Sequence, residues 1–252
     1  TLPEDGRIYR DWKEGGHGDT NLFKAITQSS NTYFFDLAYR SDINQLNKHL
    51  SSLGFGDKAC IDCFEEDQVF VPEPSWKMNK HNFGWFKGDT VNMGVGQGYL
   101  VSTPIQLAKY AYIIANKGKF SDLSLKKDLV KSEKSIEFNK FSNDDWFKLH
   151  ESMVNVIEGN TGTARRLREK KNYIVAAKTG TAELVSGDNR EQYSETRLDD
   201  SLRDHALIIA FGPMPNPRYA VSVVVENGES GGSVAGPVAI SVLNSLIQEW
   251  DI

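Results

Sequence analysis

The spacing of apolar side chains divides this chain into a helical first part and a strand-rich second part. Through most of residues 1–160, apolar residues recur every three or four positions, which is the period of an amphipathic helix. Across residues 161–252, short apolar runs lie between turn-forming residues, as β-strands do, and one amphipathic stretch follows them. The pattern therefore predicts an α+β fold, an α/β sandwich in which a helical lobe accompanies an antiparallel sheet with a C-terminal helix on one face.

Capping residues place the ends of the predicted helices. We expect Asp19 or Thr20 to cap the first helix, and Ser29-Ser30-Asn31 to separate it from the second. Thr103-Pro104 opens the clearest helix, with proline in its first turn and Gly118 as its C-cap. The other helical segments are predicted at residues 32–39, 42–53, 144–159 and 234–250, with a helical turn or loop at 162–170.

Three strands and two irregular stretches complete the predicted architecture. Residues 54–98, which contain Pro72, Pro74 and many glycines, should form few regular elements. The lysine-rich residues 119–142 are interpreted as a polar insert on the surface. The strands are predicted at residues 173–177, 206–211 and 219–226, and the turn sequence G-P-M-P-N-P-R joins the last two as a hairpin.

Composition narrows the class of protein. The 252 residues are 39% apolar and 25% charged, which is typical of a folded globular protein with a sizeable core. A net charge of -5 argues against nucleic acid as the main partner. No apolar stretch approaches the roughly 18 residues of a membrane-spanning helix. Because the chain starts at Thr1 and not at an initiator methionine, we expect a fragment or a processed product.

The two cysteines of the chain, Cys60 and Cys63, form a C-x-x-C pair. Such a pair occurs as a redox couple, as half of a metal site or as two structural thiols. A four-cysteine zinc site is excluded within one chain because there is no second pair. We favour structural cysteines, unpaired or disulfide-bonded, over a redox or metal function.

An apolar run at residues 173–177 ends in Lys178, which is followed by T-G-T. A lysine at the end of a buried strand gains nothing there unless an anion meets it. Taken alone, Lys178 reads as a solvated lysine and Ser29 as a helix cap. However, a Ser-x-Asn motif at residues 29–31 followed by Lys-Thr-Gly at 178–180 matches two parts of the signature of penicillin-binding proteins and class A β-lactamases.

Longer stretches extend this resemblance over nearly the whole chain, with the 119–142 insert as the main unmatched piece. They are R-D-W-K-E-G-G-H-G, G-D-T-V-N-M-G-V-G-Q-G-Y-L-V-S-T-P-I-Q-L-A, A-A-K-T-G-T-A-E, R-D-H-A-L-I-I-A-F-G-P and V-V-E-N-G. Together they resemble a class B penicillin-binding protein, and R-D-W…G-H-G resembles its elongation type, penicillin-binding protein 2. The resemblance implies the penicillin-binding and serine β-lactamase-like transpeptidase fold, with residues 1–252 as part of one transpeptidase domain.

That family is a class of peptidoglycan D,D-transpeptidases. A serine attacks the D-Ala-D-Ala bond of a stem peptide, D-Ala leaves, and an amine of another stem peptide takes the acyl group. The resemblance implies that Lys178 gives positive potential for the terminal carboxylate of the substrate, while the Thr179 and Thr181 hydroxyls hydrogen-bond that carboxylate. Gly180 would leave room for a substrate lying along the strand, and the Thr181 N–H would form half of the oxyanion hole.

The resemblance also implies roles for Ser29 and Asn31, and the chain departs from the family pattern in lacking an early Ser-x-x-Lys motif. Ser29 would relay a proton to the leaving amine, and Asn31 would hold the substrate amide and a neighbouring lysine. The family's nucleophile belongs to a Ser-x-x-Lys motif that comes first, yet nothing before Ser29 has that pattern. We therefore expect the nucleophile and its lysine upstream of Thr1, and no catalysis by this chain alone. A later Ser-x-x-Lys string, from Ser124 to Lys127, is interpreted as a chance match.

A second departure concerns metal. Some elongation-type relatives place zinc between an aspartate, a histidine and a cysteine inside the Ser-x-Asn motif. Asp11 and His17 match the first two, but the third position is Ser30, whose hydroxyl is a poor zinc ligand. We expect no zinc and no cofactor. His17 is interpreted as a hydrogen-bonded loop histidine, and His205 as a structural residue at the start of a strand.

Two alternatives to a transpeptidase stay open. A serine β-lactamase would share the fold but would need a water-activating glutamate, which we do not identify. A non-catalytic sensor or binding module would keep the sheet without the chemistry. For the transpeptidase, the resemblance implies stem peptides, β-lactams and a membrane glycosyltransferase as partners, with no nucleic acid. It also implies a place at the periplasmic face of the inner membrane, held by an N-terminal anchor that these residues do not include.

Overall fold

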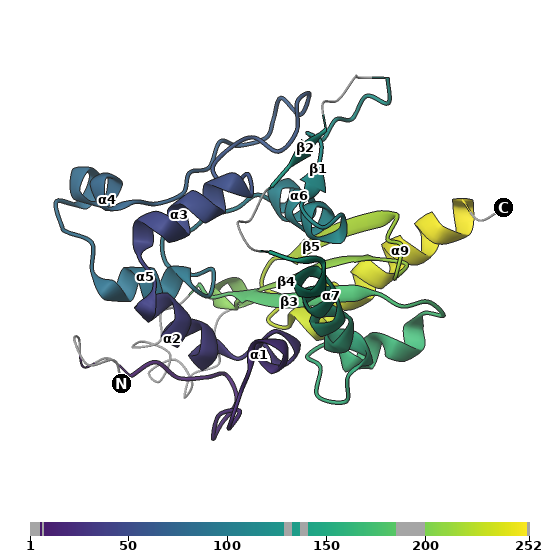
Figure 1. Ribbon diagram of the computed structural model, residues 1–252, viewed down its shortest axis with the longest axis horizontal. Helices are drawn as coiled ribbons and strands as arrows, with labels where there is room; N and C mark the ends of the chain where they lie inside the picture. Colours follow the sequence, from purple (N-terminus) through teal and green to yellow (C-terminus); the bar gives the residue numbers. More distant parts are fainter. Residues whose placement is uncertain (1–5, 7, 129–132, 137–140, 185–199, 251–252) are drawn as a thin grey trace.

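Helices surround a three-stranded antiparallel sheet in the computed structural model, which describes residues 6, 8–128, 133–136, 141–184 and 200–250 (Figure 1). A separate ladder joins two short strands of the polar insert. The antiparallel sheet predicted for the second part of the chain is confirmed. The strands are β1 (Lys119–Phe120), β2 (Lys134–Ser135), β3 (Ala176–Ala182), β4 (His205–Gly212) and β5 (Tyr219–Val225), with β1 next to β2 and the larger sheet in the order β3-β4-β5.

Seven α-helices of the described residues precede the sheet, and those outside residues 54–98 follow the apolar period of the sequence. They are α1 (Leu22–Gln28), α2 (Asn31–Arg40), α3 (Ile43–Ser52), α4 (Pro74–His81), α5 (Lys87–Met93), α6 (Pro104–Ala115) and α7 (Asn143–Glu158). The later ones are η1 (Arg165–Lys170), η2 (Asp200–Leu202), η3 (Gly231–Ala235) and α9 (Gly236–Trp250). Residues 54–98 thus hold two short helices, α4 and α5. Within the described part of the chain, no helix is both long and apolar enough to cross a membrane.

The predicted cap of the first helix is wrong by one or two residues. Asn21 caps α1, and its side-chain oxygen accepts the Lys24 N–H at 2.9 Å. Asp19 and Thr20 lie before it, and the Thr20 hydroxyl donates instead to the Gly18 carbonyl at 2.8 Å. Three consecutive polar residues are all good N-caps, so spacing alone does not select among them.

The clearest predicted helix begins as expected and ends earlier. Thr103 caps α6 in a capping box with Gln106. The C-cap is Asn116 and not Gly118. The Gly118 N–H donates to the Ile113 carbonyl at 2.9 Å, and Lys117, with a φ of 55°, takes the left-handed position. This is the Schellman pattern, in which the left-handed position that is usually a glycine is occupied here by Lys117, and Gly118 follows it.

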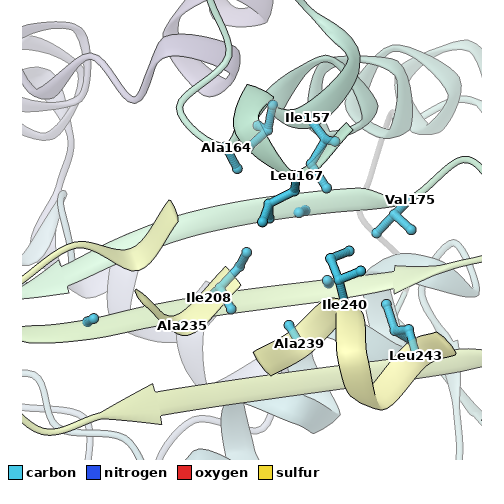
Figure 2. Close-up of a cluster of buried hydrophobic side chains, with 13 residues drawn as sticks. Ile157, Ala164, Leu167, Val175, Ile208, Ala235, Ala239, Ile240 and Leu243 are labelled. Atoms are coloured by element: carbon cyan, nitrogen blue, oxygen red, sulfur yellow. The ribbon is translucent and has the colours of Figure 1, made fainter. Parts of the chain in front are cut away.

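Apolar residues cover both faces of the β3-β4-β5 sheet. On one face, α9 and η1 pack against the strands through residues such as Leu167, Ile208 and Leu243 (Figure 2). On the other face, Ala176 and Phe211 pack against residues of α6 and α7. The predicted arrangement, with the C-terminal helix on one face of the sheet and a helical lobe beside it, is confirmed (Figure 1).

The first strand of this sheet lies further along the chain than predicted. The apolar run suggested residues 173–177, but β3 spans Ala176–Ala182. Its ladder with β4 runs from Ala176 opposite Phe211 to Ala182 opposite His205. The hydrogen-bonding partner therefore sets the strand bounds, while Val175 just before the strand packs into the same core without joining the ladder. Lys178 accordingly lies inside the strand and not at its end.

The two cysteines form a disulfide, one of the two states expected for structural cysteines. The Asp62 carboxylate between them accepts hydrogen bonds from the Leu125 N–H at 2.8 Å and from the Ser124 hydroxyl at 3.0 Å. The disulfide loop is thus attached to the start of the polar insert.

Candidate active site

The Ser-x-Asn motif forms the turn between two helices. Ser29 is the C-cap of α1 in a left-handed conformation, with a φ of 55°. Ser30 is the N-cap of α2, and Asn31 is the first residue of that helix. The indole N–H of Trp12 donates to the Ser29 carbonyl at 2.9 Å, which ties this turn to the preceding loop. The separation of two helices predicted here is confirmed.

Lys178 on β3 meets this turn directly. Its ammonium donates to the Ser29 hydroxyl oxygen at 2.6 Å and to the Thr179 carbonyl at 2.9 Å. The structure therefore brings together two motifs that are 149 residues apart in the sequence. Among the described residues, the hydrogen bonds of Lys178 go to Ser29 and Thr179 rather than to Asn31.

Burial of the ammonium lowers the pKa of Lys178 from 10.5 to about 8. The charge is held by a hydroxyl and a carbonyl rather than by a carboxylate. A partly buried cation that has no anionic partner among the described residues gains from an arriving anion, because that anion would offset the desolvation.

The edge of β3 that faces away from β4 has no partner strand among the described residues, since the sheet order is β3-β4-β5. A Cβ placed on Gly180 would meet only the Leu207 side chain, at an ordinary contact distance of 3.4 Å. Packing of the fold therefore does not require glycine there. A ligand lying along this open edge would approach closely because Gly180 has no side chain.

Sequence reasoning missed three residues that contact the two threonines of the Lys-Thr-Gly-Thr stretch. The Thr179 and Thr163 hydroxyl oxygens are 2.7 Å apart. The Thr181 carbonyl accepts a hydrogen bond from the Gln97 amide at 2.9 Å, and the Thr181 hydroxyl donates to the Glu229 carbonyl at 3.4 Å. Gln97 belongs to a G-Q-G stretch that carried part of the resemblance, so its position gave a signal. Thr163 gave none.

A buried hydrogen-bond network connects the Ser-x-Asn turn to the loop that precedes α1. The Asp11 carboxylate accepts from the Ser30 hydroxyl at 3.0 Å, and from the Thr32 N–H and hydroxyl at 3.1 and 2.9 Å. His17 lies 3.0 Å from Asp11 through Nε2, and its Nδ1 lies 2.9 Å from the Gln28 amide oxygen. Burial alone would raise the pKa of Asp11, but hydrogen bonds from Thr32 and Ser30, with His17 nearby, lower it overall.

These residues do not fit a zinc ion. Ser30 offers a hydroxyl, which donates its hydrogen to Asp11, so the third ligand of the family pattern is replaced by a hydrogen bond. Among the described residues, the one group of three potential metal ligands is Cys60, Asp62 and Cys63. Both sulfurs of that group are already in the disulfide.

Two other residues singled out from the sequence lie outside this site. Ser124 of the later Ser-x-x-Lys string bonds to Asp62 and to the Lys126 carbonyl, both at 3.0 Å, beside the disulfide loop. His205 begins β4, and its Nδ1 accepts the Asn227 N–H at 3.0 Å.

An antiparallel sheet between helices, with Lys-Thr-Gly on an open edge strand against a Ser-x-Asn turn, defines the class of serine acyltransferases that recognise penicillin. The model of the penicillin-binding protein transpeptidase domain matches residues 2–244. The chain therefore belongs to the penicillin-binding protein transpeptidase family.

Individual relatives indicate which type of penicillin-binding protein the chain is similar to. The chain is 36% identical to the peptidoglycan D,D-transpeptidase MrdA of Haemophilus influenzae, over 98% of this chain and 39% of that protein. Penicillin-binding protein 2 of Pseudomonas aeruginosa, solved in complex with WCK 5153, is 35% identical with a TM-score of 0.85, over 98% of this chain and 53% of that one. The Helicobacter pylori protein, solved in complex with MreC, is 31% identical with a TM-score of 0.86, over 100% of this chain and 44% of that one. The chain thus spans about two fifths of the curated relative.

Proposed function

We propose that this chain is part of the transpeptidase domain of an elongation-type peptidoglycan D,D-transpeptidase. Residues 1–160 would form its helical lobe and residues 161–252 its sheet and C-terminal helix, with 119–142 as an insert. The observation that carries the proposal is the 2.6 Å hydrogen bond from Lys178 to Ser29, which joins the Ser-x-Asn and Lys-Thr-Gly motifs beside an open strand edge. The family and the relatives support it.

The proposed reaction starts with a serine nucleophile from a Ser-x-x-Lys motif outside these residues. Its hydroxyl oxygen forms a bond to the penultimate D-Ala carbonyl, and its proton passes to a lysine of the same motif. The Thr181 N–H stabilises the oxyanion that develops on that carbonyl. When the C–N bond breaks, Ser29 passes a proton to the leaving D-Ala amine, and the amine of a second stem peptide later replaces the serine.

Within these residues the chemistry divides between proton transfer and substrate binding. Ser29 accepts a hydrogen bond from Lys178, which leaves the Ser29 proton free to be donated toward the leaving group. Asn31 would hold the substrate amide from the first turn of α2. Lys178, Thr179 and Thr181 would bind the terminal carboxylate, and Gly180 would leave space for the substrate backbone along β3.

The proposed partners follow from the family. They are peptidoglycan stem peptides as substrates, β-lactams as acylating inhibitors and a membrane glycosyltransferase of the elongation machinery. The relative from Helicobacter pylori was solved in complex with MreC, which supports a protein partner for the whole protein. We place that protein at the periplasmic face of the inner membrane, anchored by an N-terminal segment.

The intact mass of this chain before and after benzylpenicillin, beside a form extended upstream through a Ser-x-x-Lys motif, tests the proposal. We expect a penicilloyl adduct on the extended form only. An adduct on this chain, mapped to Ser124 or elsewhere, would overturn the assignment of the nucleophile. Rapid release of the adduct by hydrolysis would indicate a β-lactamase instead. No adduct on either form would favour a non-catalytic binding module.

A further inference from the structure

Thr163 contacts the Lys-Thr-Gly strand from a segment that no motif of the sequence pointed to. It lies in the connection between α7 and η1, and its hydroxyl oxygen is 2.7 Å from that of Thr179. Neither the alternation of side chains along β3 nor the hydrogen bonds of the sheet require this contact between the two hydroxyls. It therefore needs an explanation from the chemistry of Thr179.

The backbone around Thr163 is fixed on both sides. The Ala164 N–H donates to the Val156 carbonyl at 2.9 Å, and Ala164 is 1% exposed. A Cβ on Gly162 would lie 2.2 Å from the Val156 carbonyl oxygen, and a Cβ on Gly232 would lie 2.5 Å from the Thr163 carbonyl oxygen. Both glycines are needed for these close approaches, so the Thr163 hydroxyl is presented from a position with little freedom.

A hydroxyl has one hydrogen to donate and two lone pairs to accept with. A carboxylate only accepts, so Thr179 binds a carboxylate only when its own hydrogen points at that carboxylate. In that state the short contact with Thr163 requires Thr163 to be the donor. We propose that Thr163 is a positioning residue, which donates to Thr179 and thereby turns the Thr179 hydrogen toward the terminal carboxylate of the substrate; this inference rests on the proposed function.

The pair of contacts on β3 supports this role. Successive side chains of a strand point to opposite faces, so Lys178 and Thr179 lie on opposite faces of β3. Ser29 holds Lys178 from one face at 2.6 Å, and Thr163 holds Thr179 from the other at 2.7 Å. The two side chains lie on either side of the open edge of β3, and each is held before a substrate arrives at that edge, which lowers the entropic cost of binding.

The test compares variants of the full-length protein with benzylpenicillin, which bears the carboxylate, and with its methyl ester, which does not. Thr163→Val removes the hydroxyl at nearly constant shape, and Thr163→Ser keeps it. We expect Thr163→Val to lower the second-order acylation rate about tenfold for benzylpenicillin and less than about twofold for the ester, while Thr163→Ser stays near the wild type. In Thr179→Val, adding Thr163→Val should bring little further loss.

Thr161→Val is the matched control, because its hydroxyl lies in the same connection but accepts from the Gln28 amide at 3.0 Å. It should leave the ratio of the two acylation rates unchanged. Equal slowing of both ligands by Thr163→Val, no slowing of either, or additive losses with Thr179→Val would overturn the inference. Thr163→Ala, read against Thr163→Ser, replaces the valine variant if that variant does not fold. Failure of the wild type to be acylated would instead count against the proposed function.

Discussion

At the scale of the residue, Lys178 is the group whose surroundings differ most from those of an ordinary surface lysine. Its ammonium is buried, it donates to Ser29 and Thr179, and the pKa of Lys178 is lowered to about 8. The folded protein therefore releases this proton more readily than the unfolded chain does. Keeping the charge buried costs stability below pH 8, and that cost disappears as the pH rises from about 8 toward 10.5.

This lowered pKa predicts how acylation depends on pH. In the full-length protein, the second-order rate constant for benzylpenicillin should fall above about pH 8, because free Lys178 then loses the charge that, in the proposed function, attracts the carboxylate. In Lys178→Arg the arginine keeps its charge at high pH. The acylation rate constant of this variant should therefore not decline above pH 8, even if it is lower than that of the wild type at every pH. Stopped-flow acylation from pH 6.5 to 9.5 measures both. A wild-type rate that stays flat across this range would contradict the prediction.

At the scale of the element, the turn between α1 and α2 depends on a carboxylate outside both helices. Asp11 accepts hydrogen bonds from Ser30 and Thr32, so it satisfies donors at the start of α2. An anion at a helix N-terminus also opposes the positive end of the helix dipole. The position of Ser29 thus follows from the 11–17 loop as much as from the helices that it separates.

Asp11→Asn should loosen this turn. We expect a loss of about 1–3 kcal/mol in the free energy of unfolding, because hydrogen bonds to a charged acceptor are weakened or lost. Acylation by benzylpenicillin should also slow as the Ser29 position broadens. Asp36→Asn is the matched control, since Asp36 lies on α2 in an exposed ion pair with Arg40, for which we expect less than about 1 kcal/mol. Urea unfolding measures both variants, and equal effects would argue against the role of Asp11.

The helices and strands also show which parts of the fold could be predicted from the sequence. The helices outside residues 54–98 and the hairpin follow from apolar period and turn residues, and so does the start of α6 after Thr103. The bounds of β3 do not, because the partner strand β4 and not local apolarity decides which residues pair. The family motifs placed Ser29 and Lys178 together in function. The contact of Thr163 with Thr179 could not be predicted, because a threonine between two helices has no spacing that indicates a contact across the fold.

At the scale of the whole molecule, the buried His150 makes the stability of the core on the α6 and α7 face of the sheet depend on pH. His150 on α7 packs between Trp146 and Phe211 of β4, and its Nε2 donates to the Ile114 carbonyl of α6 at 2.7 Å. Because a carbonyl only accepts, Nε2 carries the hydrogen. Burial lowers the pKa of His150 below 6.5, so the unfolded chain takes up a proton before the folded one does.

Stability should therefore fall as the pH drops below about 6.5, by at most about 1.4 kcal/mol per pH unit from this group. His150→Gln retains an N–H donor for the Ile114 carbonyl but does not titrate, so it should reduce the slope of unfolding free energy between pH 7 and 5.5. His49→Gln, at an exposed position of α3, is the matched control for the change from histidine to glutamine. Urea unfolding of the wild type and both variants at several pH values measures these slopes. An unchanged slope in His150→Gln would rule this group out as the cause.

The bond between Ser29 and Lys178 has a consequence for the order of folding. It closes a loop of 149 residues, so we expect it to form late in folding, when the helical lobe docks on the sheet. Penicillin labelling in a pulse-chase experiment would then mark molecules that have completed their last long-range contact, and nascent or misassembled chains would escape the label even though they carry both motifs.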